Sequence, residues 1–247
     1  MFADHFSLRA PEYARYRPDY PESLFRFLAR EAPGGGRAWD CATGSGQAAL
    51  GLAGHFDDVL ATDASIRQVS NAARHRRVRY AVAAAEEAPL AAGSVALVAA
   101  AQALHWFDRG RFWAEARRVL VPGGIVAVWS YHGFHVTPEV EAVVGRFYRE
   151  VVGPCWPPER AVVERGYGDL EFPFESLTPP AFVLEKLWDL PAVIGYLKTW
   201  SAAQRYEAAL GRDPLRLVRR DLEAAWGPSE RARAFRWNLD LRVGRKA

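Results

Sequence analysis

The fold is decided by the stretch Trp39-Asp40-Cys41-Ala42-Thr43-Gly44-Ser45-Gly46-Gln47. Three glycines at 34–36 precede it, and the alanine- and leucine-rich segment 48–53 that follows is a good helix former. This order predicts a strand, a tight turn and a helix. At Gly44 and Gly46 the backbone can approach a ligand closely, and the first N–H groups of the helix have no partner within it. The stretch therefore predicts a site for a nucleotide-like cofactor.

Two cofactor classes fit this turn. The pattern Gly44-x-Gly46-x-x-Ala49, followed by Asp63, fits a dinucleotide fingerprint in which an acid contacts the ribose. Asp40 favours another class, because a carboxylate at the strand end would repel a pyrophosphate and attract a cation. S-adenosylmethionine has an ammonium and a sulfonium at that end and no phosphate. We therefore predict S-adenosylmethionine, and a nicotinamide dinucleotide or a turn without a ligand remain alternatives.

The composition predicts one globular domain without a membrane or nucleic-acid partner. The chain has 247 residues, 50% of them hydrophobic, and a net charge of only +3 without long runs of like charge. The first residues lack the apolar core of a secretion signal, and the most apolar window, 95–104, is too short to cross a bilayer. Cys41 and Cys155 indicate neither a disulfide framework nor a metal site. We expect a cytoplasmic monomer or homodimer.

Strand and helix patterns alternate over the first 130 residues, which predicts a parallel sheet with helices on both faces. Later segments are rich in proline and aromatic residues and read as helices and loops, with further strands over 181–188 and 233–244. We divide the single domain into four kinds of segment. These are an N-terminal arm and helix over 1–33, a cofactor-binding core over 34–132, an acceptor-side cap over 133–180 and 190–230, and final strands over 181–189 and 232–245.

Residues that follow the predicted strands add to the site, because ligands bind at the carboxyl edge of such sheets. Asp63 ends the second strand, where an acid commonly holds a ribose diol; the alternative is that Asp63 or Ser65 caps the next helix. The segment 102–107 follows the fourth strand. His105 is the one obvious base in it, acting either as a catalytic base or as a structural hydrogen-bonding group. Trp106 is expected as a pocket wall.

Together these motifs resemble those of class I S-adenosylmethionine-dependent methyltransferases over essentially the whole chain. Asp40-x-Ala42-x-Gly44-x-Gly46 matches their first motif, although Ala42 stands where a glycine is usual, so we expect the loop to bend differently or to keep φ negative there. Asp63 matches the ribose-binding acid, Ala85-Glu86 the loop beside the adenine, and 118–124 the run before the fifth strand.

The resemblance implies an α/β, Rossmann-like sheet of seven mostly parallel strands with a last antiparallel strand, helices on both faces and a helical cap inserted late in the chain. It also implies S-adenosylmethionine as methyl donor and no metal. The predicted cofactor-binding residues are Tyr13, Arg17, Asp40, Ala42, Gly44, Gly46, Gln47, Asp63, Ala64, Ala85, Glu86 and Gln102.

A narrower resemblance, to trans-aconitate methyltransferase-like proteins, rests on the segments 16–21, 101–107, 156–160 and 199–201. It implies the cofactor but hardly the acceptor. We expect a small-molecule acceptor, a carboxylic acid being one such class, with Arg17 or Arg160 as a clamp for the carboxylate unless these arginines are merely solvated. The alternatives are methylation of protein or nucleic acid, and cofactor binding without catalysis. The predicted substrate-binding residues are His105, Trp106, Trp156, Arg160, Tyr167 and Trp200.

Overall fold

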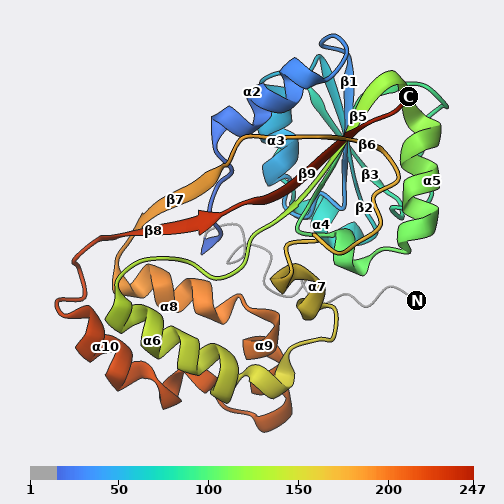
Figure 1. Ribbon diagram of the computed structural model, residues 1–247. Helices are drawn as coiled ribbons and strands as arrows, with labels where there is room; N and C mark the ends of the chain where they lie inside the picture. The colour runs from blue at the N-terminus through green and yellow to red at the C-terminus, as the bar shows by residue number, and fades with distance from the viewer. Residues whose placement is uncertain (1–15) are drawn as a thin grey trace.

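The computed structural model describes residues 16–247, and a seven-stranded sheet of order β3-β2-β1-β4-β5-β9-β6 forms its centre (Figure 1). Strands β1 to β5 run parallel to one another, and β9 is antiparallel to both of its neighbours, β5 and β6. This arrangement confirms the predicted fold class. The strands are β1 (Arg37–Cys41), β2 (Asp58–Asp63), β3 (Val78–Val82), β4 (Val95–Ala101), β5 (Leu120–Ser130), β6 (Glu175–Leu177) and β9 (Asp240–Arg245).

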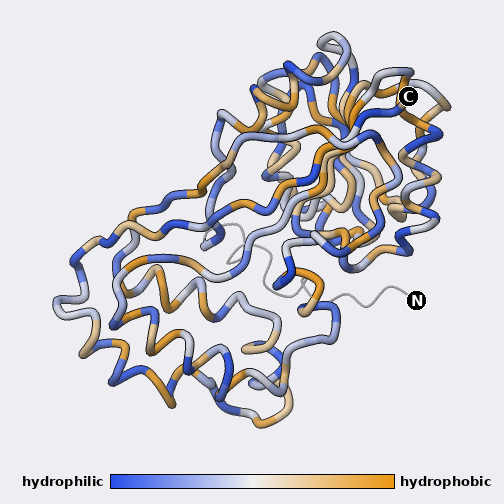
Figure 2. The backbone as a smooth tube through the Cα atoms, in the orientation of Figure 1, coloured by the Kyte–Doolittle hydropathy of each residue, from blue (hydrophilic) through white to orange (hydrophobic). Residues whose placement is uncertain are grey.

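Helices cover both faces of this sheet. Ala38 packs with α2 (Glu22–Glu31) and α3 (Gln47–Ala53), whereas the next residue, Trp39, packs on the opposite face with α5 (Arg109–Val119). The short helix α4 (Ile66–Asn71) connects β2 to β3. Because both faces are covered, the central strands are apolar along their length, as the hydropathy colours of Figure 2 show.

Strand β5 starts earlier than the sequence indicates. Its first residues include Pro122, Gly123 and Gly124, which belong to the run 118–124 that we expected before this strand. Instead, Gly123 donates its N–H to the carbonyl of Lys246, and Lys246 donates in return to Gly124. Gly123 has a φ of +73°, so glycine lets the chain leave α5 and enter the sheet within a few residues.

The late part of the chain forms a helical region beside the carboxyl edge of the sheet (Figure 1). A separate two-stranded antiparallel sheet, β7 (Val183–Trp188) with β8 (Arg233–Asn238), runs from the main body to these helices. The helices are α6 (Pro138–Arg146), α7 (Arg160–Glu164), α8 (Leu190–Lys198), α9 (Ser201–Leu210) and α10 (Arg219–Trp226), with short turns η3 (Phe147–Val151), η4 (Gly153–Cys155) and η5 (Pro214–Leu217).

The segment 233–244, which we expected to be one last strand, is two strands. Strand β8 pairs with β7 and ends before Leu239. After Leu239, β9 enters the main sheet between β5 and β6. The alternating pattern continues through the break, so the sequence does not reveal the change of partner. Among residues 16–247, no helix combines the length and apolarity needed to cross a membrane.

Candidate functional site

The turn after β1 has an unusual backbone. Ala42, Gly44 and Gly46 have φ angles of +54°, +55° and +88°. Ala42 therefore does not keep a negative φ, and the alternative expectation of a different bend stays a prediction. The space where Gly44 would carry a Cβ is open, whereas a Cβ on Gly46 would lie 2.4 Å from the hydroxyl of Tyr80. Gly44 thus leaves room for a ligand, and Gly46 accommodates the tyrosine.

Asp40 is fully buried at the end of β1 and has one unused oxygen. Its Oδ2 accepts a hydrogen bond from the hydroxyl of Thr43 at 2.5 Å, while its Oδ1 has no partner within the described part of the chain. Burial raises the pKa of Asp40 to about 7, and the nearby charge of Asp63 adds to this rise. A buried carboxylate with an unsatisfied oxygen suits a cationic ligand group, as S-adenosylmethionine provides.

Asp63 is held rigidly beside the turn. Its Oδ2 accepts the N–H of Gly44 and its Oδ1 the N–H of Ser65, both at 2.9 Å. Ser65 is the N-cap of α4, since its hydroxyl accepts the N–H of Gln68. The alternative that Asp63 itself caps this helix is therefore wrong. Its role as the acid that binds a ribose diol stays a prediction.

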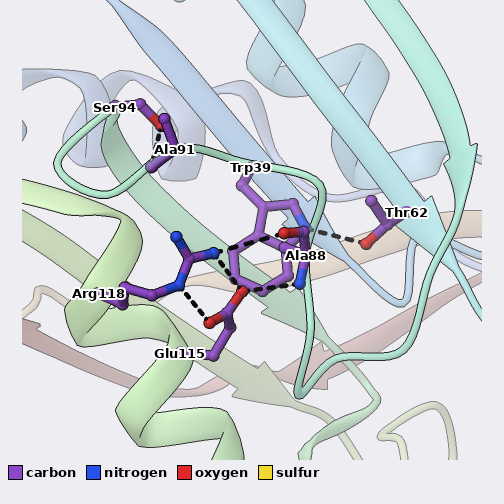
Figure 3. A network of polar contacts seen from close by, with 7 residues as sticks. All are labelled: Trp39, Thr62, Ala88, Ala91, Ser94, Glu115 and Arg118. Carbon is purple, nitrogen blue, oxygen red and sulfur yellow. Dashed lines mark hydrogen bonds and ion pairs between the residues drawn. The ribbon is translucent and has the colours of Figure 1, made fainter.

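The loop 84–90, which contains Ala85 and Glu86, is fixed from α5 (Figure 3). Glu115 accepts a hydrogen bond from the N–H of Ala88 at 2.7 Å. It also forms an ion pair with Arg118, at 2.7 Å as well. This ion-paired hydrogen bonding lowers the pKa of Glu115. Glu86 in turn accepts the N–H of Asp108, directly before α5. The loop that we expect beside the adenine is therefore part of the rigid frame.

Other predicted cofactor residues take different positions. Ala64 is exposed directly after β2, and Gln47 donates to Pro18 and Asp19 of the preceding segment. Arg17 and Gln102 line the acceptor cavity described below. Tyr13 lies outside the described residues.

Two exposed apolar side chains near Asp63 escaped the sequence reasoning. Ile66 is 61% exposed and Val82 is 50% exposed, and Val82 is the strand partner of Asp63. Apolar groups at this edge suit the adenine ring, so the whole set fits S-adenosylmethionine. No group of three or more potential metal-binding side chains occurs within residues 16–247.

A cavity of about 580 Å³ lies between the strand ends and the helical region. Five of the six predicted substrate-binding residues line it: His105, Trp106, Trp156, Arg160 and Trp200. The sixth, Tyr167, is fully buried behind His105. Sequence reasoning missed Tyr148, Arg149 and Tyr196, because their side chains reach the cavity from helices far from the strand ends.

Arg160 has a fixed orientation in this cavity. Its guanidinium lies 4.6 Å from the ring of Trp156 and 5.4 Å from that of Tyr148. Its Nε donates to the Tyr148 hydroxyl at 2.7 Å, and Glu164 accepts a hydrogen bond from the same hydroxyl. No hydrogen bond from the described residues engages its two terminal nitrogens. Such a planar pair of donors can bind a carboxylate in bidentate geometry.

His105 is a neutral group in this structure. Burial and then the charge of Arg160 lower its pKa to about 3. Its Nδ1 lies 2.8 Å from the hydroxyl of Tyr167, so one ring nitrogen is already engaged. So low a pKa makes His105 a poor proton acceptor and fits the structural alternative better than general base catalysis.

A second histidine, which the sequence reasoning passed over, also lines the cavity. His132 follows β5, and its Nδ1 lies 3.4 Å from Oδ2 of Asp240, the first residue of β9. The same argument that singled out residues after β4 could have found His132. Its partner Asp240 could not be found this way, because the pairing of β9 with β5 is not visible in the sequence.

Comparisons with known proteins agree with this geometry. Residues 39–128 match the family model described as "Methyltransferase domain". The chain is 32% identical over 229 residues to a provisionally assigned methyltransferase from Dictyostelium discoideum, covering 91% of this chain and 87% of that protein. It is 30% identical over 201 residues to methyltransferase cfoB from Aspergillus candidus, covering 70% of this chain and 62% of that protein.

A solved structure gives the same result. A provisionally assigned type II methyltransferase from Anaeromyxobacter dehalogenans superimposes with a TM-score of 0.87 at 48% identity, covering 93% of this chain and 98% of that chain. The glycine turn, the sheet order and these relatives together show that the chain belongs to the class I S-adenosylmethionine-dependent methyltransferases.

Proposed function

We propose that this enzyme methylates a small organic acid whose carboxylate is bound by Arg160. S-adenosylmethionine, the methyl donor, supplies an electrophilic methyl group on a sulfonium. The observation that carries the proposal is the pair of terminal nitrogens on Arg160, which make no hydrogen bond to residues 16–247 and which two aromatic rings and a tyrosine hydroxyl hold in one orientation. A half-buried, preorganised guanidinium of this kind binds a carboxylate with little loss of side-chain entropy.

The size and lining of the cavity support a small acceptor. About 580 Å³ is within the range of small-molecule sites, and aromatic walls combined with more arginine than glutamate side chains suit an acid with an apolar body. Arg17 lines the same cavity, with its guanidinium 5.4 Å from the ring of Tyr196 and a hydrogen bond to the carbonyl of Thr199. This position favours the acceptor role of Arg17 over a donor-binding role.

The test is a transfer assay with methyl-labelled S-adenosylmethionine and a panel of organic acids, each paired with its primary amide. We expect label in the acids and none in the amides. Arg160→Gln should raise the acceptor KM by about 10- to 100-fold, because a charge-assisted bidentate pair contributes about 1.5–3 kcal/mol. Arg165→Gln removes an arginine that pairs with Asp169 outside the cavity and serves as the matched control.

Three results would overturn the proposal. Transfer of label only to protein or nucleic acid would show a macromolecular acceptor, and donor binding without transfer to any acceptor would show a non-catalytic binding protein. If Arg160→Gln and Arg165→Gln change the acceptor KM equally, Arg160 does not bind the acceptor.

A further inference from the structure

We propose that His132, oriented by Asp240, is the general base of the reaction, and that the methylated atom is a hydroxyl oxygen of the acceptor. The inference rests on the proposed function and deepens it. The carboxylate of the acceptor is then an anchor at Arg160, and a separate hydroxyl group receives the methyl. The acceptor class is a small hydroxy acid.

The geometry of His132 is that of an oriented base. Its Nδ1 faces a carboxylate oxygen of Asp240 at 3.4 Å, a separation that commonly tightens when a ligand closes the site. A carboxylate at Nδ1 favours the tautomer with a proton there, which leaves Nε2 as the proton acceptor. His132 lines the cavity, and the side chains of His132 and Asp240 are 38% and 34% exposed, so neither group is sealed in the core.

The fold holds Asp240 in this position from two sides. Its backbone is the strand partner of Ser130, two residues before His132, so the two side chains meet at the carboxyl end of β5. Gly166 packs directly on the Asp240 side chain, since a Cβ at Gly166 would lie 2.8 Å from its Cγ. The carboxylate therefore has little freedom to turn away from His132.

Charged side chains of both signs line the same cavity as His132. The charged residues that line the same cavity are Arg17, Glu141, Arg149, Arg160 and Glu164, and His105 also lines it as a neutral group. Glu164 contacts Arg160 at 3.8 Å, and Glu141 accepts the N–H of Val136. Asp240 is the acid in contact with the His132 ring, and it stabilises the imidazolium that forms when Nε2 takes a proton.

The chemical step balances without another reactant. The acceptor oxygen loses its proton to Nε2 of His132 and forms a bond to the donor methyl carbon. The carbon–sulfur bond breaks, and its electron pair remains on sulfur in S-adenosylhomocysteine. His132 then releases the proton to solvent. A carboxylate acceptor would need no base, because it is already ionised at neutral pH.

The first experiment identifies the product and the base. With a hydroxy acid that the panel shows to be active, the product should be a methyl ether that resists alkali. His132→Gln should lower kcat by about 100-fold or more and remove the acid limb of the pH–rate profile, as expected for loss of a general base. Asp240→Asn should lower kcat by a smaller factor, about 10-fold, because its side chain acts through His132. His135→Gln is the control, since His135 contacts Glu141 but lies outside this cavity.

A second experiment needs no acceptor. In the ligand-free enzyme labelled with ¹⁵N-histidine, the NMR signals of His132 should show the proton on Nδ1, and Asp240→Asn should shift them. An alkali-labile methyl ester as product, an unchanged kcat for His132→Gln, or a His132 protonated on Nε2 alone would overturn the base assignment. If no organic acid receives label, the proposed function is overturned instead. The NMR experiment then still shows which ring nitrogen of His132 carries the proton.

Discussion

The hydroxyl of Tyr167 lies 2.8 Å from Nδ1 of His105 and connects a strained turn to the cavity that His105 lines. Tyr167 has a φ of +60°, which is rare for a bulky residue, and Arg242 of β9 donates to its carbonyl at 2.7 Å. The backbone strain is thus held in place by the antiparallel strand. The arrangement fixes the ring of His105 in one orientation.

Tyr167→Phe should lower the free energy of unfolding by about 1 kcal/mol, because one buried hydrogen bond is lost. The acceptor KM should rise as His105 gains freedom, while the affinity for S-adenosylhomocysteine stays unchanged. Urea unfolding and calorimetric titration measure the two effects. Tyr206→Phe is the control, since the Tyr206 hydroxyl has no hydrogen bond to a described residue. Equal losses in both variants would contradict the role of the Tyr167 contact.

The low pKa of His105 predicts a dependence of stability on pH. Its folded value of about 3 lies below the value of about 6.5 expected in the unfolded chain. Between these values the unfolded state binds the proton more readily, so stability should fall as the pH decreases from about 6.5 towards 3. His105→Gln should make the unfolding free energy less dependent on pH in this window. An unchanged slope would show that His105 does not titrate in this way.

The raised pKa of Asp40 predicts that donor binding strengthens with pH. A cationic ammonium prefers the ionised carboxylate, so the affinity for S-adenosylhomocysteine should rise through pH 7, and binding near pH 6 should release a proton. Calorimetry in buffers of different ionisation enthalpy measures this proton.

Asp40→Asn should abolish the proton release and weaken binding by about 10-fold or more. In the ligand-free enzyme it should increase stability at pH 8, because the folded pKa of Asp40 is raised and its ionisation above pH 7 costs native-state stability. A proton release that persists in Asp40→Asn would assign the effect to another group.

Ala42→Gly should stabilise the protein by about 0.5–1 kcal/mol. Relief of the left-handed conformation at Ala42 contributes about 1–2 kcal/mol, and the added entropy of the unfolded chain offsets about 0.4–1 kcal/mol of it. Thermal and urea unfolding measure the change. Ala29→Gly in α2 should instead destabilise by about 1 kcal/mol, as glycine does inside a helix. Destabilisation by both substitutions would contradict strain at Ala42.

Glu115→Gln should weaken the hydrogen bond and ion pair that fix the loop 84–90 to α5, shown in Figure 3, and so destabilise the fold. The pKa of Glu115 is lowered by its hydrogen bonds with Arg118, so the ionised pair stabilises the fold above the unfolded value of about 4.3 and this stabilisation is lost in acid. The difference in unfolding free energy between wild type and Glu115→Gln should therefore shrink from pH 7 to pH 3. Glu223→Gln, in an exposed pair with Arg219, should change stability by less than about 0.5 kcal/mol at either pH.

Much of the fold follows from local patterns. The turn over 39–47, the buried run of β4 and the helix α5 could be predicted because glycine positions and apolar spacing act over a few residues. Parallel strands then bring their carboxyl ends to one edge, which is why five of the six predicted acceptor residues line one cavity. The predicted cofactor site rests on the same reasoning, and Asp40 and Asp63 both form hydrogen bonds with the turn after β1.

What the sequence by itself determined is therefore the parallel part of the sheet, the glycine turn after β1 and the edge at which the candidate site lies. Only the tertiary structure decided that β9 enters beside β5, which places Asp240 against His132, and that Tyr167 reaches His105 across 62 residues. It also left one oxygen of Asp40 buried without a partner among residues 16–247. These relationships depend on long-range strand pairing and on the packing of the helical region, and neither leaves a periodic signal in the chain.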